Sequence, residues 1–437
     1  MAPPGWPQLI LEAGFSAGPP VQSGAFTLDD PAFGQLDNDT LGTGNVWTGM
    51  TAWLRSGSVT RPANRQQGPL WSYSPAALTV TCGSADGRFD PDNTGGPWYG
   101  ALNPMVPVRL RAVWSNITWP LFSGFADAWT DDGTNRGPGW AETGITATDA
   151  QKILAAITLP AVAAVGAGEA TGTRITRILT AASWYTSGDQ RNIAPGDSTV
   201  QAYTGGDTAW NLMQATADAE IGELYIDGAG RVTFRNRKAI MTAPRSATPQ
   251  AVFGDAPGTA EPAGTERPYQ LLPRARVDTT LANDIQATRA GGTAVQQVTD
   301  AASITAYLFP RSYTRSDLIL TDDPTVLNWA QWVLYISKTP EDRLDQITVN
   351  PLRDPASLWP QVLGREIGDR IQVWHRPPGV ASPIVKDVFI RGIAHAFDCA
   401  AGTWATTWTL QDAAKYGSFL TLDHPVLGQL DENALTF

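Results

Sequence analysis

The chain has few of the residues on which most metal and acid–base sites depend. It contains only two cysteines, Cys82 and Cys399, and three histidines, His375, His395 and His424, among 437 residues. The cysteines are too few and too far apart for a zinc cluster or a disulfide framework, and we interpret them as small buried hydrophobic residues. Three histidines leave little for a mechanism that needs several imidazoles. The sequence therefore predicts no metal site and no cofactor.

Glycine-rich and acidic segments resemble fragments of binding loops, but each lacks the rest of its motif. Residues 166–172 and 291–292 lack the strand, glycine loop and helix of a phosphate site. Residues 131–133 and 227–230 lack the series of acidic ligands that a calcium loop needs. We interpret all four as loops or turns. His395 lies in an apolar strand, where a packed imidazole is commoner than a catalytic one, and we expect no enzymatic activity.

Long hydrophobic runs are absent as well. The most apolar segment, residues 153–166, is too short to span a bilayer and contains Pro160. The first residues, Met-Ala-Pro-Pro-Gly-Trp-Pro, include no cationic region followed by an apolar core. We expect a soluble protein with no secretion signal and no membrane span.

The composition favours a β-rich protein with several cores. The chain has 31 Lys and Arg against 42 Asp and Glu, a net charge of −11, which excludes a basic nucleic-acid binder of the usual kind. Its 42% hydrophobic residues and 17 tryptophans supply enough apolar surface for several domains. The 42 glycines and 33 prolines follow no triplet period, which favours short strands joined by turns.

Hydrophobic periodicity divides the chain into two β regions with a mixed region between them. Helical spacing over residues 149–157 and 207–220, and a hairpin signal over 223–235, predict the mixed α/β region. A further helix is expected over 324–337, after Asp322 and Asp323. Alternating apolar residues predict strands over 8–13, 78–82, 106–114 and 118–124, and over 283–288, 346–350, 370–374, 385–393 and 403–410.

We therefore expect a multidomain, β-rich α+β fold with two small β-barrel-like domains and a mixed α/β region. The expected domains are an N-terminal barrel-like domain at 1–130, a mixed α/β domain with a linker at 131–266, a second barrel-like domain with one inserted helix at 267–412, and a C-terminal arm at 413–437.

The C-terminal arm repeats a segment near the N-terminus. Residues 27–41 align without gaps to residues 421–435, with most positions identical. Each copy combines an Asp/Pro turn, a glycine and spaced apolar anchors. We expect each copy to bind a neighbouring surface through its apolar edge. The alternative is a recurrent turn-and-strand element without a binding role. The expected anchors are Leu28, Pro31, Leu36, Leu422, Pro425 and Leu430.

One long loop has the composition of a rigid surface element. Residues 83–106 are dense in Gly, Pro and Asp and carry Trp98 and Tyr99. In the strand that follows, Arg109 and Arg111 alternate with apolar residues, so one strand face is cationic and suited to an acidic partner surface. Exposed aromatic rings of this kind stack on sugars, which makes carbohydrate binding an alternative function.

This loop also carries a resemblance to a known family. The block Asp86-Gly-Arg-Phe-Asp-Pro, continuing to Ala112, and the segment Trp119-Pro-Leu-Phe that follows it resemble minor tail proteins of long-tailed actinobacterial phages, specifically their baseplate or tail hub protein. The resemblance continues over residues 223–235, 318–323, 368–373 and 389–395, so it covers most of the chain.

The resemblance implies a structural virion protein at the tail tip. It implies a homotrimeric hub in which two barrel-like domains per subunit form a pseudo-sixfold ring. The implied partners are the distal tail protein ring, the tape measure protein and other tail-tip proteins. DNA would pass through the channel without specific binding, and the net negative charge predicts an acidic lumen that repels phosphate.

Two other functions stay open at this point. Family members can carry a hydrolase or receptor-binding module after the hub domains. We expect the residues up to Phe437 to include no such module. A carbohydrate-binding tail protein is the first alternative to the hub, and a cell-wall hydrolase is the second.

Overall fold

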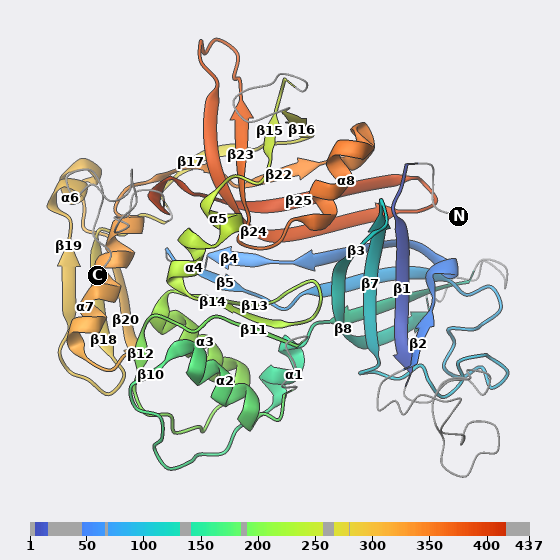
Figure 1. The fold of residues 1–437 in the computed structure, drawn as a ribbon, viewed down its shortest axis with the longest axis horizontal. Coiled ribbons are helices and arrows are strands. Elements are labelled where there is room, and N and C mark those ends of the chain that lie inside the picture. The colour runs from blue at the N-terminus through green and yellow to red at the C-terminus, as the bar shows by residue number, and fades with distance from the viewer. Residues whose placement is uncertain are drawn as a thin grey trace.

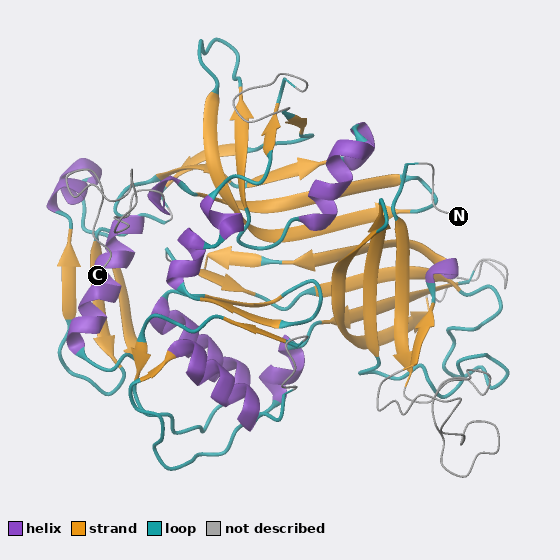
Figure 2. Ribbon diagram, in the orientation of Figure 1, coloured by secondary structure: helices purple, strands orange, loops and turns teal. Residues whose placement is uncertain are grey.

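The computed structural model describes residues 5–15, 46–65, 69–131, 141–184, 190–256, 266–278 and 280–416. One large sheet occupies the upper and right parts of the molecule in Figure 1, and two smaller regions that combine helices and strands lie beside it (Figures 1 and 2). Within the described residues, no helix is long and apolar enough to cross a membrane.

The large sheet has 13 strands and is mostly antiparallel. Its order is β16-β15-β23-β24-β3-β6-β9-β8-β7-β1-β2, with β25 paired to β24 and β22 paired to β25. The strands are β1 (Gln8–Phe15), β2 (Val46–Gly49), β3 (Leu54–Arg61), β6 (Ala77–Gly83), β7 (Pro107–Trp114), β8 (Ile117–Asp131), β9 (Glu142–Thr148), β15 (Val252–Gly254), β16 (Arg267–Pro268), β22 (Gln346–Val349), β23 (Arg370–His375), β24 (Ile384–Asp398) and β25 (Thr403–Asp412).

The two predicted β regions meet in this sheet at the pairing of β24 with β3. His395 lies opposite Val59, and Phe397 lies opposite Gly57. A Cβ atom on Gly57 would lie 2.8 Å from the Phe397 ring and 2.7 Å from Val80, so only glycine fits this position without displacing a neighbour. The β-rich fold is confirmed. A closed barrel is not seen in the part of the chain that the structure describes, where β2 and β16 are the ends of the main path through the sheet.

Tryptophan rings fill one part of the core beside the sheet. Trp404 of β25 contacts Trp6 and Trp359, with ring centroids 5.5 Å and 5.0 Å apart. Trp359 belongs to helix α8 (Pro355–Gly364), and its indole N–H donates to the carbonyl of Gly5 at 2.7 Å. The first described residues and the C-terminal strands thus share one core.

The middle region packs two helices on a small sheet of its own. The sheet has the order β11-β14-β13, and Ile226 pairs with Val232 across the predicted hairpin. Asp227 closes the turn by accepting from the amides of Ala229 and Arg231. The elements are α1 (Gln151–Ala156), β10 (Glu169–Ala170), α2 (Thr171–Ala181), β11 (Arg191–Ile193), β12 (Thr199–Val200), α3 (Ala209–Glu220), β13 (Glu223–Ile226), β14 (Val232–Arg235), α4 (Arg237–Thr242) and α5 (Pro244–Ala247).

The third region places helix α7 (Asp323–Ser337) against the sheet β19-β18-β20. Asp322 accepts from the amide of Thr325 at 2.8 Å and starts the helix as predicted. The buried face of α7 includes Trp329 and Val333. The remaining elements here are β17 (Arg274–Val277), β18 (Asp284–Arg289), β19 (Gln296–Thr299), α6 (Ala301–Tyr307), β20 (Ser312–Leu318) and β21 (Glu341–Leu344).

The described part of residues 267–412 contains three α-helices, α6, α7 and α8, where the sequence indicated one. α6 is short, and α8 includes Pro360, which breaks the helical pattern in the sequence. The smaller elements of the chain are the hairpin β4 (Ala63–Arg65) and β5 (Trp71–Tyr73), and the 3₁₀ turns η1 (Thr51–Trp53), η3 (Pro351–Arg353) and η4 (Ala414–Tyr416).

Two predictions about organisation remain predictions. The domain boundaries after residues 130, 266 and 412 are one of them. The other is the repeat, because both of its copies, 27–41 and 421–435, lie outside the described residues.

Candidate functional site

The loop between β6 and β7 is held by a series of turns rather than by strand pairing. The amide of Gly87 donates to the Ser84 carbonyl at 2.8 Å, and the Asn93 side-chain amide donates to the Gly87 carbonyl at 2.9 Å. Gly87 has a φ of +66°, which favours glycine. The expected rigid loop therefore has a physical basis in backbone and Asn side-chain hydrogen bonds.

Trp98 is the buried anchor of this loop, which contradicts the exposed position that the carbohydrate alternative assumed. Its side chain is 5% exposed, and its ring lies 4.8 Å from Phe89 and 5.3 Å from Trp53. Arg88 stacks on Trp53 at 3.8 Å. Tyr99, the next residue, is 55% exposed. Of the two predicted aromatic residues, only Tyr99 is available to a ligand or partner.

Arg109 and Arg111 form ion pairs within the sheet. Both contact Glu12 of β1 at 2.7 Å, and Arg109 also stacks on Trp47 at 3.9 Å. Burial acts to raise the pKa of Glu12, but the hydrogen bonds and charges of the two arginines outweigh it and hold the pKa below its ordinary value. The predicted cationic face is thus partly neutralised by one carboxylate and keeps a net positive charge.

A buried ionic cluster joins the large sheet to the middle region. Glu223 of β13 pairs with Arg391 of β24 and with Arg235 of β14, the latter at 3.0 Å. Arg391 is 1% exposed, and its Nε donates to Gln411 at 2.6 Å. Tyr416 receives a hydrogen bond from Gln411 at 3.0 Å. Sequence reasoning missed this cluster because its members are far apart in the chain.

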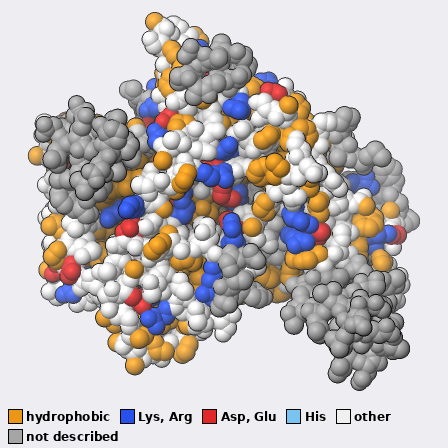
Figure 3. All heavy atoms as spheres, viewed as in Figure 1, with side chains coloured by type: hydrophobic (Ala, Val, Ile, Leu, Met, Phe, Trp, Pro, Cys, Tyr) orange, Lys and Arg blue, Asp and Glu red, His pale blue; other side chains and the backbone are white. Residues whose placement is uncertain are grey.

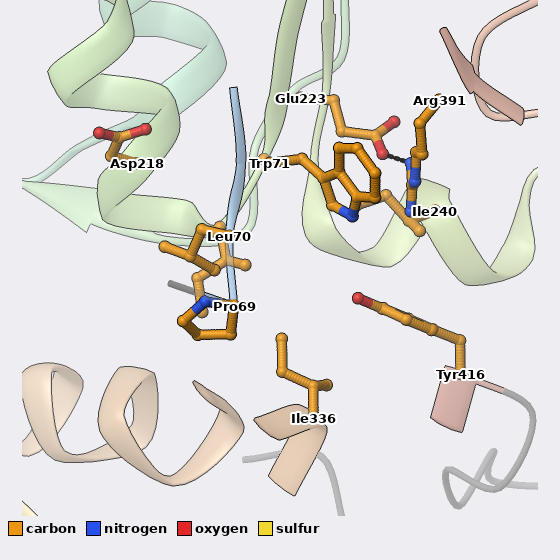
Figure 4. A pocket seen from close by; sticks show the side chains of 11 residues that line it. Pro69, Leu70, Trp71, Asp218, Glu223, Ile240, Ile336, Arg391 and Tyr416 are labelled. Atoms are coloured by element: carbon orange, nitrogen blue, oxygen red, sulfur yellow. Dashed lines mark ion pairs between the residues drawn. The ribbon is translucent and has the colours of Figure 1, made fainter. Parts of the chain in front are cut away.

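A small pocket beside this cluster lies where segments of all the regions meet. Figure 4 shows Trp71 of β5, Ile336 of α7 and Tyr416 around it, with Glu223 and Arg391 on one wall. Its volume is about 30 Å³, which is room for one or two waters and not for a substrate. We interpret it as a small gap in the packing between the regions and not as an active site.

The buried titratable groups are hydrogen-bonded or packed within the fold. His395 is packed and hydrogen-bonded as expected: its ring contacts the Thr406 hydroxyl at 2.9 Å, and burial lowers its pKa to about 3. Burial raises the pKa of Asp149 to about 7, and this carboxyl accepts from the amides of Ala76 and Gln151. Cys82 is buried as predicted, whereas Cys399 is half-buried. The described residues include no group of three or more His, Cys, Asp or Glu side chains placed to hold a metal ion.

One serine motif needs separate mention. Residues 14–18 read Gly-Phe-Ser-Ala-Gly, the pattern of a nucleophile elbow, which stands between a strand and a helix of an α/β-hydrolase sheet. Gly14 and Phe15 end strand β1, which pairs antiparallel with β7 and β2, and Phe15 is buried. Ser16 itself lies outside the described residues. The sheet context is not that of a hydrolase elbow.

Comparison with known proteins finds likeness in the fold. No family model matches the sequence, and no curated protein matches it. A tail protein from Neisseria meningitidis MC58 matches with a TM-score of 0.57 and 11% identity, over 94% of this chain and 98% of that one. The 43 kDa tail protein of prophage MuSo2 from Shewanella oneidensis matches with a TM-score of 0.52 and 11% identity, over 94% and 99%. The chain has the fold of these tail proteins. Both alignments cover nearly all of each chain, so the likeness is not confined to one region.

Proposed function

We propose that this protein is a structural component of a phage tail and forms the baseplate hub at the tail tip. The hub closes the tail tube, joins the distal tail ring to the tip and lets DNA pass during ejection. The observation that carries this proposal is the fold shared with two tail proteins over nearly the whole of each chain. The resemblance of residues 86–129 to actinobacterial tail hub proteins supports the finer assignment.

The geometry suits a rigid structural part better than an enzyme. The large sheet joins strands from both ends of the described chain, and buried ion pairs fix the middle region against it. Arg109 and Arg111 are paired with Glu12, and His395 is buried. A rigid shape that holds its neighbours in place accounts for this arrangement without a catalytic step.

The proposed assembly is a homotrimer in the virion, in contact with the distal tail ring, the tape measure protein and other tail-tip proteins. We propose that acidic residues behind the net charge of −11 face the channel. An acidic channel would repel DNA phosphates and so let DNA pass during ejection. Co-expression with the distal tail protein tests the proposal. A stable complex that contains three copies of this chain is expected, whereas a monomer that binds no tail protein contradicts it.

A carbohydrate-binding tail protein is the second candidate, and the exposure of Tyr99 favours it. A cell-wall glycan pull-down that is lost on Tyr99→Ala would support this candidate. Unchanged glycan binding by that variant, or no glycan binding by the native protein, would remove the role of Tyr99.

A further inference from the structure

A cavity of about 220 Å³ lies between the middle region and the third region, and we call it the inter-region cavity. Strand β12 and helix α7, at the left of Figure 1, both contribute to its wall. The volume is many times the roughly 10–15 Å³ that one water needs, and ligand sites are common where two domains meet. Its wall includes Asp197, Ser198 and Arg237 from the middle region, and Leu320, Asn328 and Trp329 from the third region.

The guanidinium of Arg237 has hydrogen-bonding capacity that the fold does not use. The side chain is half-buried and stacks on the Trp332 ring at 4.8 Å. With the residues that the structure describes, its guanidinium makes no hydrogen bond and no close ion pair. Burial lowers the pKa of Arg237, although the charges of Glu220 and Asp197 act to raise it. These neighbours therefore do not fully replace the water that the guanidinium has lost.

Three more polar side chains on the wall have unused hydrogen-bonding groups. Asp197 accepts through Oδ2 from the Asn236 side chain at 2.9 Å and from the Lys238 amide at 3.3 Å. Its Oδ1, and the side chains of Ser198 and Asn328, have no hydrogen-bond partner in the described part of the chain. A guanidinium only donates, a carboxylate only accepts, and a hydroxyl or an amide does both. A ligand that satisfies all four side chains needs both donors and acceptors.

The wall is held in shape by hydrogen bonds that leave these groups available. Glu220 is 0% exposed and accepts from the amides of Asp197 at 3.0 Å and Ser198 at 3.3 Å. The Thr199 carbonyl accepts from the amide of Thr321 at 3.3 Å, which ties β12 to the third region. The binding groups are therefore pre-organised, which lowers the entropic cost of binding.

The charges at the cavity favour a neutral polar ligand. An anion would meet the carboxylate of Asp197, and a cation would meet the guanidinium of Arg237. An apolar ligand would leave both groups without hydrogen bonds, which is costly. Figure 3 shows acidic and basic side chains mixed over the face that it draws, so recognition there depends on individual groups and not on a surface of one sign.

We propose that the inter-region cavity binds one neutral sugar unit of a cell-surface glycan. The ring hydroxyls would accept from Arg237, donate to Asp197 and do both with Ser198 and Asn328, while the apolar C–H groups of the ring would pack on Leu320. The volume is below the roughly 300–1,000 Å³ of sites for drug-sized ligands, which suits one unit and not a longer chain. The inference rests on the second candidate function, carbohydrate binding, and the hub proposal does not depend on it.

Two single variants test the site by titration with N-acetylglucosamine, glucose and galactose, followed by ligand-observed NMR. Arg237→Gln removes charged donors and should weaken binding at least about 10-fold, whereas Asn328→Ala should weaken it about 3–10-fold. The matched controls are Arg353→Gln and Asn192→Ala, because both native side chains are exposed and lie outside the cavity wall. Both controls should bind as the native chain does. Thermal unfolding checks that each variant is folded.

The outcomes separate this inference from the proposed functions. A sugar that binds the native chain and both controls, and binds both cavity variants more weakly, would support the cavity. Unchanged binding in either folded cavity variant would overturn the inference. If that binding is instead lost on Tyr99→Ala, the second candidate function stands with its site at Tyr99. A native chain that binds none of the three sugars would also overturn the inference, and the hub would still be decided by co-expression with the distal tail protein.

Discussion

The large sheet and the contact between it and the middle region are stabilised in different ways. In the apolar core beside the sheet, the rings of Trp404 from β25 and Trp359 from α8 pack with their centroids 5.0 Å apart. At the contact, buried charges meet, and Glu223 pairs with Arg391 and Arg235. Apolar burial supplies stability without direction, whereas a buried ion pair forms only in one geometry and costs desolvation. We infer that the ionic cluster fixes how the regions are placed more than how tightly they are held.

The largest expected effect belongs to the apolar core. Trp404→Ala removes a ring that contacts Trp6, Trp359 and Phe397 and is expected to lower the free energy of unfolding by about 4–5 kcal/mol. Denaturant unfolding measures the loss. An effect below about 1 kcal/mol would mean that this core is not the main source of stability.

The second largest loss of stability is expected from the buried ionic cluster. Glu223→Ala leaves Arg391 and Arg235 without their shared carboxylate and is expected to cost about 3–4 kcal/mol. Asp317→Ala is the matched control, because it removes a 66% exposed partner of Arg315 and should cost at most about 1 kcal/mol. Equal effects of the two variants in denaturant unfolding would contradict the role of the buried cluster.

A smaller loss of stability is expected from a substitution at Gly57, where β3 pairs with β24. Gly57→Ala places a methyl group 2.8 Å from the Phe397 ring and 2.9 Å from the Thr79 carbonyl, and overpacking of this kind costs about 1–3 kcal/mol. Gly49→Ala is a control, because the new atom would have nothing within 4 Å and the backbone there is not in the left-handed region. Thermal unfolding should rank Gly57→Ala as the more destabilising change, and the reverse order would argue against close strand contact at Gly57.

The last expected effect is a pH dependence of the free energy of unfolding at Asp149, which is small per pH unit. Its pKa is raised to about 7, so between pH 4 and pH 7 the folded protein keeps a proton that the unfolded chain releases. The contribution of this group to stability is therefore present at low pH and is lost as pH rises through 7. The stability of Asp149→Asn relative to the native protein should rise over this range, by about 1 kcal/mol or less per pH unit. A relative stability that is flat with pH would contradict the raised pKa.

Much of the fold follows from local patterns, while the contacts across it do not. Strands β1, β7 and β25 were expected from apolar alternation, and α7 was expected from Asp322 and the spacing of its tryptophans. Strand β3 was missed because Ser, Gly and Thr dominate it, and its place is set by its partners β6 and β24.

The candidate site was harder to predict for the same reason. The sequence placed Trp98 in a loop but could not show that Phe89 and Trp53 cover it. The charges of Arg109 and Arg111 were visible in the sequence, but their partner Glu12 lies on a strand about a hundred residues earlier. The apolar character of residues 160–165 was visible too, yet only the structure shows that they are exposed.

The central claim is that this chain is a hub at the tip of a phage tail. An electron-microscopy reconstruction of the assembled tail tests it most directly, since it shows both the position and the symmetry of the chain. The account predicts three copies around the tail axis, directly beyond the distal tail ring. A tail that lacks the chain, or that carries it away from the tip without threefold symmetry, would contradict the account.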